Sequence, residues 1–435
     1  MLQTGLIPNA HGDLVTDASY DFYGLRLATC SLDQRIKIWS LDEGAGSWVM
    51  EDDWKAHDAS ISKLSWAHPE FGTVLASAGF DRTVKIWERV SGEARGQSEN
   101  GGSGNSSRWV ERAMLTEAKG TVRAVEFAPQ YFGLKLATIS TDNHLRVYEC
   151  LEQPSLTTWS LVEEADVSTL PLVNAPSTSL LTNALATPTQ TTSSSGDGPV
   201  GPLVAQALQQ SMSTSTATAG RPGIGHREAD GGWCISWCKD RYWGEIIAAT
   251  AGTSGIVKII QLQPSNRPTT ILTLDPSPSS EPAMHLAPPG VSAAGLAVPD
   301  ADVPPSASTT AVSWAPTCGR SYHLIATGSR DGHVRIWRVK PAEDEDDNGG
   351  DEDRKWSAIV VADFEQHRSA VGRVEWNITG TVLSSAGNDG RIRLWKATSG
   401  SVWRPAGSVG VEAGEDGKDV DMDETRHQRD VSMEA

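Results

Sequence analysis

Short apolar runs alternate with polar turns along most of the chain, and the same arrangement returns six times. Each unit has an apolar run, a tight polar turn and then an alternating run such as Val84-Lys85-Ile86-Trp87. This alternation has the two-residue period that is typical of β-strands rather than helices. The six predicted hairpins are residues 26–39, 74–87, 135–148, 246–260, 324–337 and 382–395, of which 246–260 is the least regular.

A further strand is predicted on each side of every hairpin, which gives four strands per unit. The predicted first strands are residues 15–20, 61–66, 122–127, 234–237, 311–314 and 371–376. The predicted fourth strands are residues 48–54, 109–115, 159–165, 270–274, 357–364 and 402–408. Four-stranded units that repeat with tryptophan at fixed offsets are typical of a β-propeller. We therefore expect an all-β, six-bladed WD-repeat β-propeller.

The six units differ in length because of insertions between strands. The blades are predicted at about residues 11–54, 57–116, 119–166, 230–275, 308–364 and 367–409. The insertions are residues 96–107, 168–226, 276–307 and 341–353, and they are rich in Gly, Ser, Thr, Pro or acidic residues. Such compositions bury too little apolar surface to offset the entropy of ordering the chain. We expect mobile insertions and a disordered acidic tail at residues 410–435.

A polar set recurs at fixed offsets within the hairpins. An aspartate lies six residues before the closing aromatic residue, a hydroxyl lies four residues before the aspartate, and a histidine opens three units. Buried polar groups need hydrogen-bond partners, so we expect each set to form a structural network with buried aspartates. The sets are His11, Thr29, Asp33 and Trp39; His57, Ser77, Asp81 and Trp87; Thr138, Asp142 and Tyr148; Thr327, Asp331 and Trp337; and His367, Ser385, Asp389 and Trp395.

The same residue types also suggest a hydrolase triad of serine, histidine and aspartate. A catalytic triad occurs once in an enzyme, whereas this set recurs in separate blades, so we expect no catalytic residue. The sequence has no Walker-type loop and no G-x-G-x-x-G after a strand, and its histidines lack metal-ligand spacing. We therefore expect neither a cofactor nor a metal site.

Charge and cysteine content limit the partners further. The chain of 435 residues has a net charge of −18, and most of this excess lies in residues 343–353 and 410–435. Nucleic-acid affinity depends mainly on basic residues that neutralise phosphates, so direct nucleic-acid binding is not expected. The five cysteines form no C-x-x-C pair, no signal peptide opens the chain, and no apolar run is long enough for a transmembrane segment. These features predict reduced thiols inside the cell.

The ends of the predicted ring are left unjoined. All six units are complete in sequence order, and ten residues precede His11. We therefore expect an open six-bladed propeller, with no strand to interlock its first and last blades. Unpaired faces are docking sites that proteins normally cover, so a partner is expected to add strands there by β-augmentation. Leu6 and Ile7 are the candidate partner-binding residues near this gap.

Four long segments carry motifs that are more specific than the repeat alone: HGDLVTDASYDFYGLRLATCSLDQRIKIW, WAHPEFGTVLASAGFDRTVKIWE, FAPQYFGLKLAT and WNITGTVLSSAGNDGRIRLW. These segments resemble the WD-repeat nucleoporins of the Sec-thirteen family. The resemblance covers blades one, two, three and six well and blades four and five loosely, and the long insertions look fungal. It implies an open propeller whose missing seventh blade comes from a helical nucleoporin of the outer-ring Y-complex.

The resemblance also implies a function. It suggests a structural scaffold of the nuclear pore complex at the nuclear envelope, with other Y-complex subunits as partners, that supports transport of protein and mRNA. It further suggests a subunit of a coat-like complex at the vacuole or lysosome surface that regulates TOR signalling. The alternatives are a COPII vesicle-coat propeller, or a substrate-receptor propeller of a ubiquitin ligase. The stretches WVER from Trp109 and NITG from Asn377 fit the nucleoporin better than the COPII paralogue.

Overall fold

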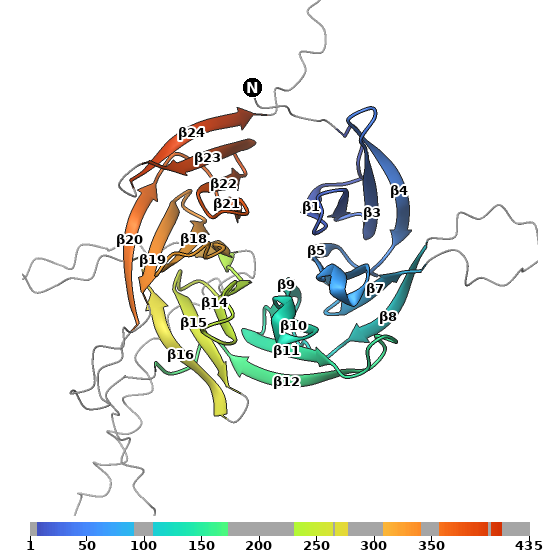
Figure 1. Ribbon diagram of the computed structural model, residues 1–435, viewed down its shortest axis with the longest axis horizontal. Helices are drawn as coiled ribbons and strands as arrows, with labels where there is room; N and C mark the ends of the chain where they lie inside the picture. The colour runs from blue at the N-terminus through green and yellow to red at the C-terminus, as the bar shows by residue number, and fades with distance from the viewer. Residues whose placement is uncertain are drawn as a thin grey trace, which may run out of the picture.

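The computed structural model describes residues 7–90, 108–172, 230–263, 266–276, 308–340, 356–398 and 402–410. These residues form six four-stranded antiparallel sheets, which are arranged as blades around a central axis (Figure 1). Figure 1 shows the first strand of a blade near the axis and the fourth strand at the rim. The fold is the predicted six-bladed all-β propeller.

The strands of each blade pair in sequence order. Blade one contains β1 (Val15–Tyr20), β2 (Arg26–Ser31), β3 (Arg35–Asp42) and β4 (Ser47–Lys55). Blade two contains β5 (Ile61–Trp66), β6 (Val74–Gly79), β7 (Val84–Arg89) and β8 (Trp109–Leu115). Blade three contains β9 (Val122–Phe127), β10 (Lys135–Ser140), β11 (His144–Cys150) and β12 (Trp159–Asp166). Short 3₁₀ helices η1 (Pro69–Phe71) and η3 (Gln130–Phe132) follow β5 and β9.

The second half of the ring repeats this arrangement. Blade four contains β13 (Cys234–Trp237), β14 (Ile246–Thr250), β15 (Val257–Gln263) and β16 (Asn266–Leu274). Blade five contains β17 (Thr309–Trp314), β18 (His323–Ser329), β19 (Val334–Lys340) and β20 (Ser357–Phe364). Blade six contains β21 (Val371–Trp376), β22 (Val382–Gly387), β23 (Arg391–Ala397) and β24 (Trp403–Gly410). No described residue belongs to a helix that is long and apolar enough to cross a membrane.

The third strand of each blade carries the same irregularity. Its pairing with the fourth strand shifts register next to the closing aromatic residue or its equivalent, as between Ile86 and Trp87 in blade two. Such β-bulges increase the local twist of a sheet. The twist of each blade is therefore built in at the same position of every repeat.

Apolar packing between blades forms the core. Five clusters of buried residues join blade one to two, two to three, three to four, four to five and five to six. The joint between blades one and two packs Ile36 and Ile38 against Leu75 and Trp87. Among the described residues, no such cluster joins blade six to blade one. The ring is therefore open on this side, as Figure 1 shows between β24 and β1.

The predicted insertions fall largely outside the described part of the chain. This applies to residues 96–107, 173–226, 277–307 and 341–353, to the tail after Gly410, and to Leu6. Residues 168–172 are described and pack onto blade four: Lys258 Nζ donates to the carbonyls of Ser168 at 3.1 Å and Leu170 at 2.9 Å, and Leu172 bridges to Thr270. The prediction that an unpacked insertion begins at residue 168 is therefore wrong.

A buried histidine lies where blades four and five meet. His323 is 1% exposed, and within the described structure neither ring nitrogen has a hydrogen-bond partner. Three indoles surround its ring, those of Trp243, Trp314 and Trp356, with centroids 5.3–6.0 Å away. Burial lowers the pKa of His323 to about 4; Asp240 opposes this shift and Arg320 adds to it. The imidazole is therefore neutral at physiological pH.

This histidine should make the fold sensitive to acid. The unfolded chain binds a proton at His323 near the ordinary pKa of 6.5, and the folded chain does so only near about 4. The free energy of unfolding should therefore fall as the pH decreases through this interval. His323→Phe should reduce that fall, and His68→Phe, at a partly exposed histidine, should retain it. Urea unfolding across the interval measures both slopes, and equal slopes in wild type and His323→Phe would contradict this explanation.

Candidate functional site

The structure brings the recurrent polar set together in blades one, two and six. In blade two, His57 Nδ1 lies 2.9 Å from Asp81 Oδ2 and His57 Nε2 lies 2.7 Å from Ser77 Oγ. The indole Nε1 of Trp87 donates to the same Ser77 oxygen at 2.9 Å. The matching distances in blades one and six are 2.8–3.1 Å. These sets are His11, Thr29, Asp33 and Trp39, and His367, Ser385, Asp389 and Trp395.

Each complete set joins the segment before the first strand to the hairpin turn. Asp81 also accepts the backbone N–H groups of Asp58 at 3.2 Å and Thr83 at 3.1 Å. Burial raises the pKa of Asp81, but hydrogen bonds from His57 and Thr83 outweigh it and hold the pKa well below its usual range. The aspartates of the three sets are partly rather than fully buried, because the turn itself lies at the surface.

These sets have the distances of a hydrolase triad but not its accessibility. A nucleophilic serine must reach a substrate carbonyl, whereas Ser77 is fully buried and its oxygen already accepts an indole N–H. Thr29 and Ser385 are buried in the same way. The arrangement holds strands together and offers no exposed nucleophile.

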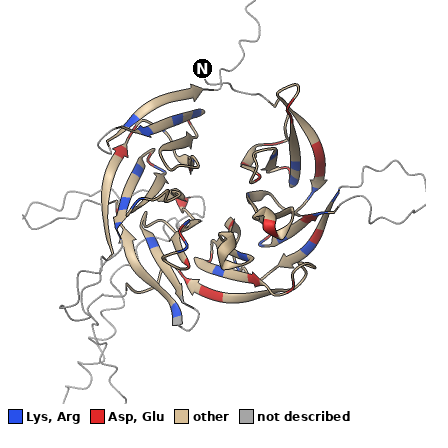
Figure 2. Ribbon diagram, viewed as in Figure 1, with Lys and Arg blue, Asp and Glu red and all other residues tan. Residues whose placement is uncertain are grey.

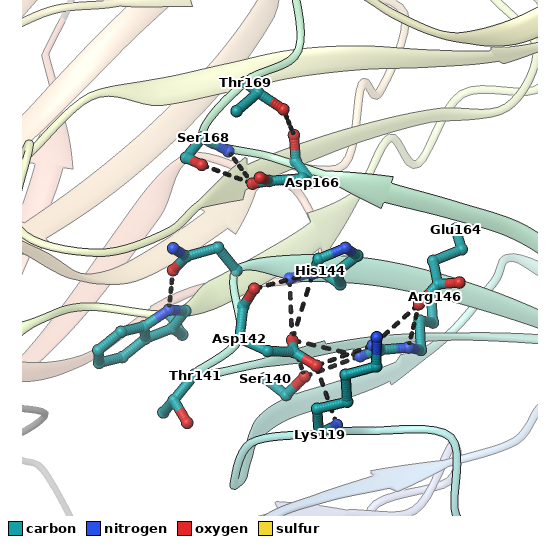
Figure 3. Close-up of polar contacts among 12 residues, drawn as sticks. Lys119, Ser140, Thr141, Asp142, His144, Arg146, Glu164, Asp166, Ser168 and Thr169 are labelled. Atoms are coloured by element: carbon teal, nitrogen blue, oxygen red, sulfur yellow. Dashed lines mark hydrogen bonds and ion pairs between the residues drawn. The ribbon is translucent and has the colours of Figure 1, made fainter.

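Blade three uses a different network, which Figure 3 shows. Ala118 stands where three other units have histidine, and the guanidinium of Arg146 fills the role instead. Arg146 Nη2 lies 2.8 Å from Asp142 Oδ2 and 2.9 Å from a carboxylate oxygen of Glu164. The Tyr148 hydroxyl donates to Glu117 at 3.1 Å. Thr138 is buried in the same blade, but no described hydrogen bond joins it to Tyr148.

Blade five forms half of the set. Trp337 Nε1 donates to Thr327 Oγ1 at 3.0 Å, as in the complete sets. Asp331 is exposed and accepts hydrogen bonds from Ser329 Oγ and, at 3.0 Å, from His333 N. The prediction that Asp331 is buried is therefore wrong. At the offset from the first strand that histidine has in three other units, the sequence has Pro305, which lies outside the described residues.

Blade six exposes an apolar side chain that every other blade buries. Ile392 of β23 pairs with Ala386, and the residues in this register elsewhere face the next blade. Ile392 is 47% exposed, whereas its equivalents are at most 3% exposed. Those equivalents are Ile36, Val84, Leu145, Val257 and Val334.

The faces of blades six and one that border the gap are its two walls, and blade one also exposes apolar side chains on its wall. Val15 begins β1 and is 48% exposed, whereas Ile61, Val122 and Val371 in the same position are at most 1% exposed. At the other end of β1, Tyr20 is exposed and packs on Trp48, with ring centroids 5.7 Å apart. Among the described residues, neither wall therefore has the neighbour that covers the equivalent positions of the other blades. Ile7, a candidate partner-binding residue, is half-buried.

An ion pair spans the gap at its inner edge. Asp17 of β1 is buried and binds Lys63 Nζ at 3.1 Å, the backbone N–H of Leu64 at 2.9 Å and the guanidinium of Arg373 from β21. Burial raises the pKa of Asp17, but Lys63 and Arg373 outweigh it and lower the pKa. This contact faces an axial cavity of about 420 Å³. The two walls thus meet through polar contacts at the axis and separate toward the rim.

Known proteins resemble the chain over nearly its whole length. Nucleoporin SEH1 of Saccharomyces cerevisiae is 31% identical over 421 residues, which cover 90% of this chain and 94% of the relative. Nucleoporin SEH1-A of Xenopus laevis and Nucleoporin SEH1 of Homo sapiens are each 33% identical, over 91% of this chain and 85% of the relative.

The chain belongs to the SEH1 family of WD-repeat nucleoporins. The model of the WD domain, G-beta repeat, matches residues 4–40, 49–88, 305–338 and 359–396. Within this SEH1-family chain, the matched repeats include all three complete polar sets. Blade three, with its Arg146 network, and blade four, which has no equivalent aspartate, lie outside the matches.

Sequence reasoning about this SEH1-family chain missed the residues that face the gap. Ile392 has the same apolar character as its buried equivalents, so no sequence signal marks it as exposed. Glu375 in β21 and Glu126 in β9 offered a signal, because both carboxylates occupy the fifth position of a first strand. The shared position of these two glutamates is visible only when the six first strands are aligned with one another.

The polar sets should differ in their contribution to stability. Asp81→Ala leaves His57 Nδ1 and two backbone N–H groups without their acceptor, so it should cost about 1–3 kcal/mol. Asp331→Ala removes an exposed carboxylate and should cost about 0.5 kcal/mol or less. Thermal unfolding followed by circular dichroism measures both variants. Equal melting temperatures for the two would contradict a structural role for the complete sets.

Proposed function

We propose that this chain is a structural scaffold subunit of the nuclear pore's outer-ring Y-complex. In this proposal a helical nucleoporin supplies strands that fill the gap between blades one and six. The observation that carries it is the exposure of Ile392 and Val15 at positions that the other blades bury. Family membership supports the pore as the location, at the nuclear envelope, and a role in protein and mRNA transport.

The surface chemistry supports a protein partner rather than a nucleic acid. Lys and Arg lie interspersed with Asp and Glu around the described ring, without a continuous basic stripe (Figure 2). Apolar surface exposed on two facing walls is stabilised when a third sheet covers it. A standard interface buries about 1,600 Å², and a blade packed on both sides should exceed that area. The proposed contact is therefore permanent rather than transient.

A second assembly fits the same open edge. We propose that the chain also serves in a coat-like complex at the vacuole or lysosome surface that regulates TOR signalling. One gap accepts one set of strands, so a given molecule would belong to one assembly at a time. In both roles the chain acts as a scaffold and not as an enzyme, in keeping with the buried hydroxyls of its polar sets.

Affinity purification from native cells tests the proposed assembly. The full chain carrying a C-terminal tag is captured, and the proteins that co-purify in equal amounts are identified by mass spectrometry. Outer-ring nucleoporins support the proposal. Stoichiometric COPII cage proteins or ubiquitin-ligase subunits in their place would overturn it.

A charge placed on the exposed wall should block the partner without unfolding the propeller. Ile392→Asp adds a carboxylate at a half-exposed position, so the melting temperature should change little. Partner strands that pack there would have to bury this charge, and co-purification should be lost. Val84→Asp is the matched control, because Val84 is 3% exposed in the same register and the variant should unfold. Retention of the partner by Ile392→Asp would contradict insertion against blade six.

A further inference from the structure

A repeating contact joins the innermost strands of neighbouring blades. The side chain at the next-to-last position of one first strand, which is the fifth position in every blade except blade four, accepts the backbone N–H of the residue that ends the next first strand. This occurs at three joints, each with a distance of 3.0 Å: Ser65 to Phe127, Glu126 to Trp237, and Ser236 to Trp314. The contact fixes the position of one first strand relative to the next along the central axis.

The backbone carbonyl at this position takes part in a different contact, also at three joints. It accepts the indole Nε1–H of a tryptophan that ends the next first strand, whereas Trp314 Nε1 has no hydrogen-bond partner among the described residues. Such bonds run from Trp66 to Ser19 at 2.9 Å, from Trp237 to Glu126 at 3.1 Å and from Trp376 to Ser313 at 3.0 Å. Glu126 makes both contacts with the one tryptophan, through its carboxylate and its carbonyl.

Glu375 occupies this fifth position in the last blade. Glu375 pairs with Ser384 of β22, and Glu126 pairs with Ala137 of β10 at the equivalent position of blade three. Its side chain is 55% exposed and contacts Arg373 of the same strand. Where Glu126 faces the next blade, Glu375 faces the gap.

Glu126 and Glu375 differ in the basic residue that binds carboxylate oxygen Oε1. Lys239, two residues after Trp237, pairs with Glu126 Oε1. In blade six, Arg373 already supplies a cation to Glu375 Oε1. The incoming strand at Glu375 therefore needs a backbone N–H and an indole, but no basic residue of its own.

We infer that Glu375 sets the register of the partner strand that lies against β21, and that this strand ends in a tryptophan. Its backbone N–H donates to the Glu375 carboxylate, and its indole N–H donates to the Glu375 carbonyl. Phenylalanine, as at Phe127, would make the first bond alone. The inference rests on the proposed blade insertion, and it specifies one residue of the partner. Hydrogen bonds to a charged acceptor are about twice as strong as neutral ones, which makes Glu375 suited to this role.

The test uses the full chain co-expressed with the partner that the native purification identifies. A photo-crosslinking residue at position 392 or 375 locates the partner segment in the gap, and a structure of the complex shows which residue faces Glu375. Dissociation rates are then measured for Glu375→Ala and Glu375→Gln. Glu70→Ala is the control, because Glu70 is similarly exposed and lies on η1 of blade two, which does not border the gap.

Glu375→Ala should dissociate about tenfold faster or more, since a bond to a charged acceptor is lost. Glu375→Gln retains an acceptor oxygen and should lose less, and Glu70→Ala should match wild type. Replacing the partner tryptophan by phenylalanine should give a smaller loss than replacing it by alanine. Two results would overturn this inference and leave the blade insertion standing. One is a wild-type dissociation rate for Glu375→Ala. The other is a complex that crosslinks at position 392 but places a residue other than tryptophan against Glu375. Absence of crosslinks at both positions overturns the blade insertion itself.

Discussion

The packing of each blade's apolar face against the next blade determines the rest of this structure. A four-stranded sheet in a propeller has two faces to cover, and five clusters of buried residues cover them at five joints. The sixth joint has no such cluster within the described chain, and Ile392 and Val15 remain half-exposed there. The same interaction that stabilises the fold therefore creates its binding surface.

The polar groups have a separate role from the apolar faces. Sets such as His57, Ser77 and Asp81 fix the turns within a blade, and their partners are supplied inside that blade. First-strand residues such as Glu126 fix one blade against another. This division explains why blade three can replace the histidine by Arg146 without losing its place in the ring, since the inter-blade contacts are made by other residues.

The sequence was sufficient to predict the blades, because alternation in runs such as Val84–Trp87 directly reflects which side chains are buried. It was insufficient where a residue's surroundings depend on distant parts of the chain. Asp331 has the same spacing as Asp81 but is exposed, and its unit has no histidine at the offset of His57 in the sequence. Ser168 belongs to a polar segment by composition, yet its carbonyl binds Lys258. The exposure of Ile392 reflects the six sheets of the described chain, which leave no seventh sheet beside β23, and no local pattern encodes this.

Hydrogen–deuterium exchange of the chain alone and in its native complex tests the open ring most directly. If partner strands fill the gap, exchange should slow in β1 and in β21 to β23 when the partner is bound. The corresponding strands of blades two to five, which already have neighbours on both sides, should change little. Protection confined to another face of the propeller, with β1 and blade six unchanged, would contradict the account.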